Sequence, residues 1–227
     1  MTGPPPPTDI ELVDCAAQTY TRTDPFAENI DNAVRVFLTT LSSGLNVIAF
    51  EGTKNAPGWL LDFLAISSSD LSVIQLFLSL GAADHPTIQH PRLGLVHAGF
   101  DAGVKSVMSK VALIAAGPFA ITGHSLGAAL ALRATAEFIL DGTPPLKCAA
   151  FAPPRVGGDK FVKITTSIPI SAYKWGDDPV PEVPFTLPPK YDYRQVPLTK
   201  VGHFELEATA CHNIKNYVSA VHAMVPS

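Results

Sequence analysis

The segment GHSLG at residues 123–127 constrains this chain more than any other stretch of the sequence. A short apolar run at 119–122 precedes it, and the small residues 128–131 follow it. That order predicts a strand, a tight turn and a helix. A G-x-S-x-G turn in this setting lifts the serine hydroxyl above the edge of a parallel sheet. The sequence therefore predicts that Ser125 is a nucleophile, against the alternative of a chance match in a Gly/Ser turn.

The two glycines of this turn are explained by the close approach of the strand and the helix. Gly123 and Gly127 allow strand and helix to pass where a Cβ would clash. Ser125 then lies at a helix N-terminus, where backbone N–H groups and the helix dipole favour negative charge. We expect the N–H of Leu126 to be one donor to an oxyanion formed on the substrate.

Strand and helix patterns alternate along most of the chain. Helices are expected over 10–20 (with Asp9 as N-cap), 100–115, 126–141, 161–168 and 213–224. Strands are expected over 33–41, 45–50 (a hairpin through 42–44), 63–66, 93–96, 119–122, 146–151, 170–175 and 191–196. The alternation indicates parallel strands covered on both faces. We predict one three-layer α/β domain over 9–227, preceded by a disordered proline-rich tail at 1–8.

A serine hydroxyl becomes nucleophilic when a histidine takes its proton and a carboxylate orients that histidine. Hydrolases with this turn carry the acid and then the histidine downstream of the serine. His203, in a loop, and His212, at the start of the last helix, are the rival bases. His222 lies well inside that helix and is expected to be a surface or packing residue.

The acid is expected at Asp177 or Asp178, because both follow the strand predicted at 170–175. That position is the carboxyl edge of the sheet, where the sites of α/β proteins gather. Asp177 has the alternative role of a solvated turn residue. The residues themselves leave this one-position ambiguity open.

Charge and cysteine content exclude several other functions. A net charge of −4 argues against binding nucleic acid, and 16% charged residues favours an uncharged, apolar ligand. The three cysteines, Cys15, Cys148 and Cys211, have no CxxC spacing, so no metal and no cofactor are expected. We expect buried thiols, with one Cys15–Cys211 or Cys148–Cys211 bridge open in an exported protein.

The start of the chain bears on location. No basic segment followed by an apolar one comes after Met1, which predicts no signal peptide. We expect a cytoplasmic protein, or a secreted one that has been processed or follows a leaderless route. Oligomeric state is not determined by the sequence.

Further short motifs occur in a fixed order around the turn. They are FEGT at 50–53, WLLDF at 59–63, VHAGF at 96–100, FAPPRVG at 151–157, DPVP at 178–181, and HNI at 212–214 with Tyr217. With GHSLG, this order resembles the class 3 lipase family, the fungal-lipase-like α/β-hydrolases. The resemblance covers about 34–221.

The resemblance assigns roles to particular residues. It implies that Ser125 is the nucleophile, Asp178 the acid and His212 the base. It also implies that Thr53 supplies a second oxyanion N–H beside Leu126. Family members commonly have arginine before the Gly-Thr pair, where this chain has Glu51, so we expect the packing there to differ. His97, His124 and Arg155 are expected to be structural.

The family resemblance also suggests how substrate is held. A lid is expected over 54–61, with Trp59 and Leu60 on its apolar face. These two residues and Val180 are the expected substrate contacts. The segment 67–91 is longer than the family needs between two strands, and it contains an apolar stretch. It is either a helix buried in the core, or an insertion that caps the acyl pocket and touches lipid transiently.

Together these features predict a carboxylic-ester hydrolase that works through an acyl-enzyme. A lipase acting on acylglycerols is the leading interpretation. Phospholipase A1 or feruloyl/aryl esterase activity is the alternative among enzymes. A catalytically silent interaction module is the alternative from another class. Neither acyl-chain preference nor regioselectivity follows from the sequence.

Overall fold

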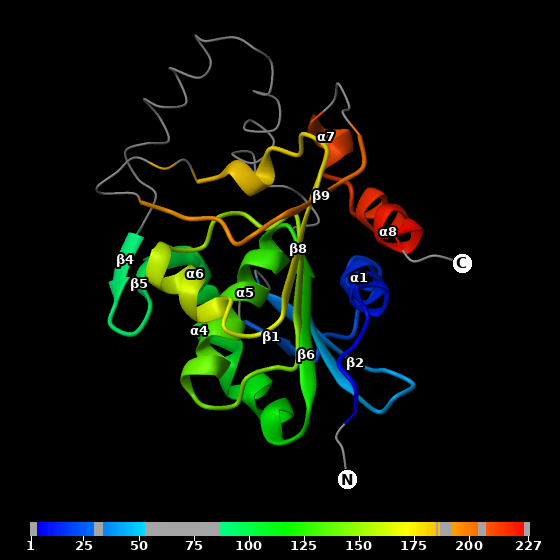
Figure 1. Cartoon of the computed structure of the whole chain (residues 1–227). Helices are drawn as coiled ribbons and strands as arrows, with labels where there is room; N and C mark the ends of the chain where they lie inside the picture. Colours follow the sequence, from blue (N-terminus) through cyan, green and yellow to red (C-terminus); the bar gives the residue numbers. More distant parts are fainter. Residues whose placement is uncertain are drawn as a thin grey trace.

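The computed structural model describes residues 4–29, 34–52, 87–184, 186, 192–203 and 208–224. These residues form a seven-stranded sheet in the order β1-β2-β3-β6-β7-β8-β9 (Figure 1). Its strands are β1 (Ala27–Glu28), β2 (Arg35–Thr40), β3 (Asn46–Phe50), β6 (Phe119–His124), β7 (Cys148–Phe151), β8 (Ile170–Trp175) and β9 (Thr199–Val201). β1, β2 and β3 pair antiparallel, and every pairing from β3 to β9 is parallel. The predicted α/β-hydrolase fold with a mostly parallel sheet is confirmed.

Helices cover both faces of the sheet (Figure 1). On one face lie α1 (Asp9–Gln18) and α8 (Ile214–Ala223), and on the other α4 (Ala98–Val111), α5 (Leu126–Leu140) and α6 (Asp159–Thr165). The shorter elements are β4 (Thr87–His90), β5 (Gly94–His97), η1 (Ala112–Ala116), η2 (Val180–Glu182) and α7 (Ala208–Cys211). β4 and β5 form a separate antiparallel pair.

Two hydrophobic cores follow from the alternation of side chains along each strand. Ile48 and Ile121 point into the core beneath α4 and α5. Their neighbours Val47 and Ala120 point into the core beneath α1 and α8. Successive strand residues face opposite sides, so a central strand that is apolar throughout must be covered twice. This is why continuous apolar runs predicted the layered fold correctly.

The first helix begins one residue earlier than expected. Thr8, and not Asp9, is the N-cap of α1, because Thr8 and Glu11 form a reciprocal capping box. The Thr8 hydroxyl accepts the Glu11 N–H at 3.2 Å, and Glu11 accepts the Thr8 N–H at 2.9 Å. Two orphan backbone donors are satisfied in this way, which makes the box a stronger cap than Asp9 alone.

The strand predicted at 191–196 is wrong. Within the described part of this segment, Arg194 forms only an isolated bridge to Gly157. Gln195 holds the chain instead, since its amide donates to the carbonyls of Pro153 and Pro181, each at 2.8 Å. The edge strand is β9, a few residues later, where Val201 pairs with Trp175. The other strands and helices that lie within the described residues occur near their predicted positions.

Some expectations concern residues that the structure describes only in part. Residues 4–8 are described, and Pro7 is buried beside α1, while 1–3 lie outside the description. The division into tail and domain stays a prediction. The strand at 63–66 and the lid at 54–61 lie outside the described residues. Of the stretch 67–91, only the part from 87 onward is described, and it begins with β4. Cys15, Cys148 and Cys211 are buried, and none of them forms a disulfide.

Candidate active site

Ser125 occupies the turn between β6 and α5 with an unusual backbone. Its φ is 58° and its ψ is −126°, a combination that a non-glycine residue rarely adopts. The close packing around the turn holds it there. A Cβ on Gly123 would overlap the carbonyl of Gly127, and a Cβ on Gly127 would overlap the carbonyl of Phe50. The strain is therefore localised at the residue whose hydroxyl must stand clear of the sheet.

His212 meets Ser125 across the carboxyl edge of the sheet. Its Nε2 lies 2.7 Å from Ser125 Oγ, and its Nδ1 lies 2.9 Å from Asp178 Oδ2. The residue stands between α7 and α8, one position before Asn213, whose side chain caps α8. The last helix therefore begins at Ile214, after His212 rather than at it. The imidazole is held between a hydroxyl and a carboxylate, the arrangement that general-base catalysis needs.

Asp178 is completely buried and accepts hydrogen bonds from three groups. Its Oδ1 accepts the N–H of Val180 at 2.9 Å. Its Oδ2 accepts from His212 and from the hydroxyl of Tyr217, the latter at 2.5 Å. These three hydrogen bonds fix the orientation of the carboxylate towards His212. Asp177, by contrast, is exposed, so the structure brings Asp178 and not its neighbour to the histidine.

Tyr217 is a residue whose role the sequence did not reveal. It lies on α8, and its hydroxyl accepts the N–H of Trp175 at 2.9 Å while it donates to Asp178. Burial, followed by the charge of Asp178, raises the pKa of Tyr217 far above its ordinary value. The phenol therefore stays protonated and remains a donor. The sequence signal was only its position after the final histidine motif.

The other histidines downstream of the serine lie elsewhere. His203 is exposed, and its ring packs edge-on against Trp175 with 5.4 Å between centroids. His222 pairs with Asp14 on α1 at 2.9 Å. The structure brings neither of them to Ser125.

One of the two predicted oxyanion donors can be placed. Leu126 is the first residue of α5, so its N–H has no acceptor within the helix and points out at the helix N-terminus. Thr53 lies outside the described residues, as do Trp59 and Leu60. Its neighbour Gly52 is described and passes beside the turn, since a Cβ there would lie 2.7 Å from the carbonyl oxygen of His124.

Ion pairs hold the segments around the site. Glu51, which stands where the family commonly has arginine, forms an ion pair with Arg35 on the neighbouring strand β2 at 2.9 Å. Glu182 on η2 binds Lys174 and Arg155, each at 2.7 Å. The loop that carries Asp178 is thereby tied to β8 and to the segment after β7.

Val180 and His97 have structural contacts. The side chain of Val180 is buried, and its backbone N–H holds Asp178, while its predicted contact with substrate stays a prediction. His97 is the N-cap of α4 and accepts the N–H of Gly99 at 3.2 Å.

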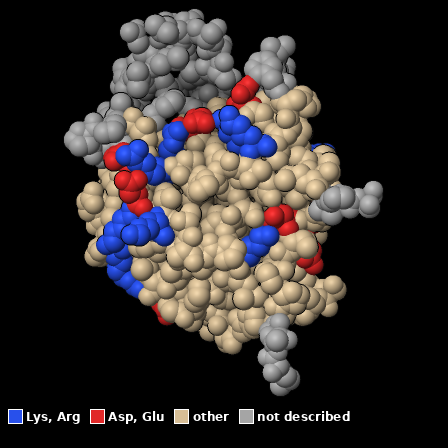
Figure 2. Space-filling view, viewed as in Figure 1, with Lys and Arg blue, Asp and Glu red and all other residues tan. Residues whose placement is uncertain are grey.

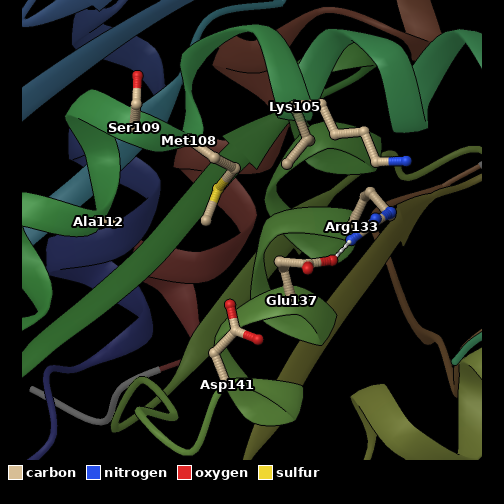
Figure 3. A pocket seen from close by; sticks show the side chains of 8 residues that line it. Lys105, Met108, Ser109, Ala112, Arg133, Glu137 and Asp141 are labelled. Carbon is tan, nitrogen blue, oxygen red and sulfur yellow. Dashed lines mark hydrogen bonds and ion pairs between the residues drawn. The ribbon is translucent and has the colours of Figure 1, made fainter.

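A hollow between α4 and α5 lies away from this site (Figure 3). Its lining residues from α5 lie in the C-terminal half of that helix, whereas Ser125 precedes the N-terminus of α5. Arg133 is fully buried there and pairs with Asp101 at 2.6 Å and with Glu137 at 2.7 Å. These charges satisfy one another and bind the two helices together.

Three further properties concern the described residues and their surface. They contain no group of three or more His, Cys, Asp or Glu side chains that could hold a metal ion. None of their helices is long and apolar enough to span a membrane. Residues other than Lys, Arg, Asp and Glu make up most of the face seen in Figure 2.

Comparison with known proteins identifies a family. The model for lipase (class 3) matches residues 47–187, a range that includes Ser125 and Asp178 and ends before His212. A secreted mono- and diacylglycerol lipase 1 from Fusarium solani is 43% identical over 68 residues. That match covers 29% of this chain and 20% of the relative, so the chain matches about a fifth of the curated relative's length.

Solved fungal lipases share the fold. Lipase II from Rhizopus niveus superposes with a TM-score of 0.62 at 18% identity, covering 96% of this chain and 90% of that one. The triacylglyceride lipase of Rhizomucor miehei gives 0.59 at 18% identity, covering 86% and 78%. Identities this low show a common architecture and no more.

Proposed function

This chain belongs to the class 3 lipase family, and from that premise we propose that it is a serine hydrolase that cleaves carboxylic esters of acylglycerols. The observation that carries the proposal is the contact of Ser125 Oγ with His212 Nε2 at 2.7 Å, with Asp178 behind the imidazole. A catalytically silent module has no need of this arrangement, which disfavours that alternative.

The chemistry proceeds in two halves. His212 Nε2 takes the Ser125 proton while Oγ attacks the ester carbonyl carbon, and negative charge develops on the carbonyl oxygen. The N–H groups of Leu126 and Thr53 stabilise that charge, each donor being worth roughly 10²–10³ in rate. The imidazolium then protonates the departing alcohol, which leaves an acyl group on Ser125. Water, deprotonated by His212, attacks the acyl-enzyme and releases the acid and the free serine.

Asp178 supports both halves of the reaction through its hydrogen bond to His212. Its carboxylate holds the Nδ1–H of His212 and stabilises the imidazolium that forms twice in each cycle. Because Asp178 is itself held by Val180 and Tyr217, it does not have to reorganise when charge appears on the imidazole.

Acylglycerols are the substrates that best suit the site and its relatives. Few charged residues in the chain favour an uncharged ligand. The Fusarium relative is named for mono- and diacylglycerol, and the Rhizomucor structure for triacylglyceride. No observation on this chain favours a phospholipid or an aryl ester over them.

Two assays test the proposal. A fluorophosphonate probe is expected to label the wild-type protein at Ser125. A panel of acyl esters from short to long chains is expected to include emulsified acylglycerols among its substrates. Ser125→Ala should lose both the labelling and the hydrolysis, while Ser106→Ala, at an exposed serine of α4, should keep both. A wild-type protein that is folded but not labelled would overturn the proposal, and activity on short esters alone would exclude a lipase.

Contact with a lipid interface forms a further part of the proposal. The complex of one structurally similar fungal lipase with an inhibitor is described as a model for interfacial activation in lipases. If the stretch 67–91 serves that purpose here, the rate should jump above the solubility limit of the substrate. Deletion of residues 70–82 should abolish the jump and preserve activity on dissolved esters. An unchanged jump in the deletion variant would disprove the role of this stretch.

The place where the enzyme works is also proposed. The Fusarium relative is named as secreted, which favours export over a cytoplasmic location. Recovery of the protein from the culture medium of the cells that produce it would support this. Its retention within intact cells would contradict it.

A further inference from the structure

The ring of His124 packs directly against the ring of the base. His124 immediately precedes Ser125 and is 3% exposed. Its ring centroid lies 4.8 Å from that of His212, with 30° between the planes, and 5.5 Å from that of Tyr217. A titratable side chain therefore lies in direct contact with His212, which becomes positively charged during the proposed reaction.

Tyr20 contacts one of the two ring nitrogens of His124. Its hydroxyl lies 2.6 Å from His124 Nδ1. Burial, with a contribution from Glu51, raises the pKa of Tyr20, so the phenol stays protonated and can donate a hydrogen bond to Nδ1. A neutral imidazole has one donor and one acceptor nitrogen. With Nδ1 as the acceptor, the proton of His124 must be on Nε2.

The surroundings also oppose a charge on His124. Its Nε2 is buried, and the ring has the backbone of His212 as a hydrogen-bonding neighbour. Burial, and then the charge of His212, hold the pKa of His124 well below its ordinary value, and they outweigh the opposing effect of a hydrogen bond with the His212 backbone. A second positive charge so close to His212 would oppose formation of the imidazolium in a site of low dielectric.

Tyr20 reaches this position from the opposite end of the chain. It follows α1, and its hydroxyl also packs against Gly52, where a Cβ would overlap it. Gly52 comes one residue before Thr53, the expected oxyanion donor. One phenol therefore touches both the base side and the oxyanion side of the site.

We propose that Tyr20 and His124 are a positioning pair for His212. The Tyr20 hydroxyl donates a hydrogen bond to Nδ1 and so stabilises His124 as the neutral Nε2–H tautomer, and the neutral ring orients His212. The inference rests on the proposed function, in which His212 takes the proton of Ser125. Neither residue touches the reacting atoms in this scheme. Both act on how His212 is held when charge develops on it.

The test uses variants that separate the hydroxyl from the ring. Tyr20→Phe removes the hydroxyl alone. His124→Asn keeps an acceptor near the position of Nδ1 and removes the ring. Tyr173→Phe is the matched control, because its hydroxyl donates to Asp9 at 3.0 Å, away from the histidines. The ¹⁵N shifts of the His124 ring report the tautomer, and kcat and KM are measured on a dissolved nitrophenyl ester.

Wild type and Tyr173→Phe should show His124 as the neutral Nε2–H form from about pH 5 to 8, the range in which an ordinary histidine ionises. Tyr20→Phe should show a mixture of tautomers and a kcat about tenfold lower, with KM changed less than about twofold, as expected for a misplaced catalytic group. His124→Asn should lose kcat similarly. The double variant should be no slower than the slower single, because both changes break one chain of contacts.

Several results would overturn the inference. One is a His124 proton on Nδ1 in the wild type, and another is an unchanged tautomer and kcat in Tyr20→Phe. Losses that simply add in the double variant would also contradict it. These outcomes differ from failure of the proposed function, which appears as a wild-type protein that fluorophosphonate does not label. The tautomer measurement needs no turnover, so it shows whether Tyr20 stabilises the Nε2–H form of His124 even if the protein is not a hydrolase.

Discussion

The hydroxyl of Tyr217 donates to Asp178 over 2.5 Å and is held in place by the N–H of Trp175 at 2.9 Å. An α8 side chain thus joins the end of β8 to the buried acid. Because a buried polar group is costly to leave without hydrogen-bond partners, this contact is part of what holds Asp178 directed at His212.

Tyr217→Phe should therefore impair both stability and turnover. Loss of one donor to a buried charge costs about 1–3 kcal/mol in the free energy of unfolding. We expect kcat to fall by about tenfold, equivalent to roughly 1.4 kcal/mol of activation free energy. Urea denaturation and ester hydrolysis measure the two effects. Tyr173→Phe serves as the control, and a Tyr217→Phe protein as active as wild type would show that Asp178 needs only its other two donors.

Replacements of Ser125 should separate backbone strain from chemistry. Its φ of 58° is unfavourable for any residue with a Cβ, and glycine is free of that penalty. Ser125→Gly and Ser125→Ala should both be inactive, but the glycine variant should unfold at higher urea, with about 1 kcal/mol or more separating the two. Equal midpoints for the two variants would mean that the turn stores no such strain.

Gly52→Ala should disturb the site from the side of the oxyanion strand. The added Cβ would overlap the hydroxyl of Tyr20 and lie 2.7 Å from the carbonyl oxygen of His124, so one of the two must move. Overpacking of this kind costs about 1–3 kcal/mol in stability, and kcat should fall because the turn itself is displaced. Gly117→Ala is the matched control, since a Cβ there meets nothing within 4 Å. Equal behaviour of the two variants in melting and turnover would disprove the expected contact.

Glu182 should make stability depend on pH in the acid range. Burial alone would raise the pKa of Glu182, but hydrogen bonds and charges from Lys174 and Arg155 outweigh it and hold the pKa below the ordinary value of 4.5. A group whose pKa is depressed by folding stabilises the protein above its unfolded pKa, and this contribution is lost as the pH falls through the folded pKa.

The matching variant is Glu182→Gln. It should be less stable than wild type at pH 7, and the difference should shrink as the pH falls below about 4, when the wild-type carboxyl also becomes neutral. Urea midpoints measured between pH 7 and pH 3 give the two curves. Parallel curves over the whole range would show that the carboxylate's ion pairs contribute nothing to folding.

Position in the fold explains which residues the sequence alone could identify. The apolar runs of β3 and β6 and the small residues of α5 predicted the layers. The glycines around Ser125 predicted the tight turn. A Cβ on Gly123 would clash with Gly127, which lies close along the chain, whereas the clash at Gly127 is with the distant carbonyl of Phe50. Sequence without the family resemblance left His203 beside His212 and Asp177 beside Asp178. The strand predicted at 191–196 failed because Gln195 bonds to loops that are distant in sequence.

What the sequence determined by itself was the class of fold, the turn that presents Ser125 and the chemistry this residue type can perform, since these depend on steric and hydrophobic effects within a few residues. Only the tertiary structure decided which histidine lies 87 positions from Ser125 yet within 2.7 Å of it, and that Tyr20 and Tyr217 stand behind the site. Contacts of that kind depend on how α1 and α8 pack on the sheet. No local pattern of residues encodes that packing.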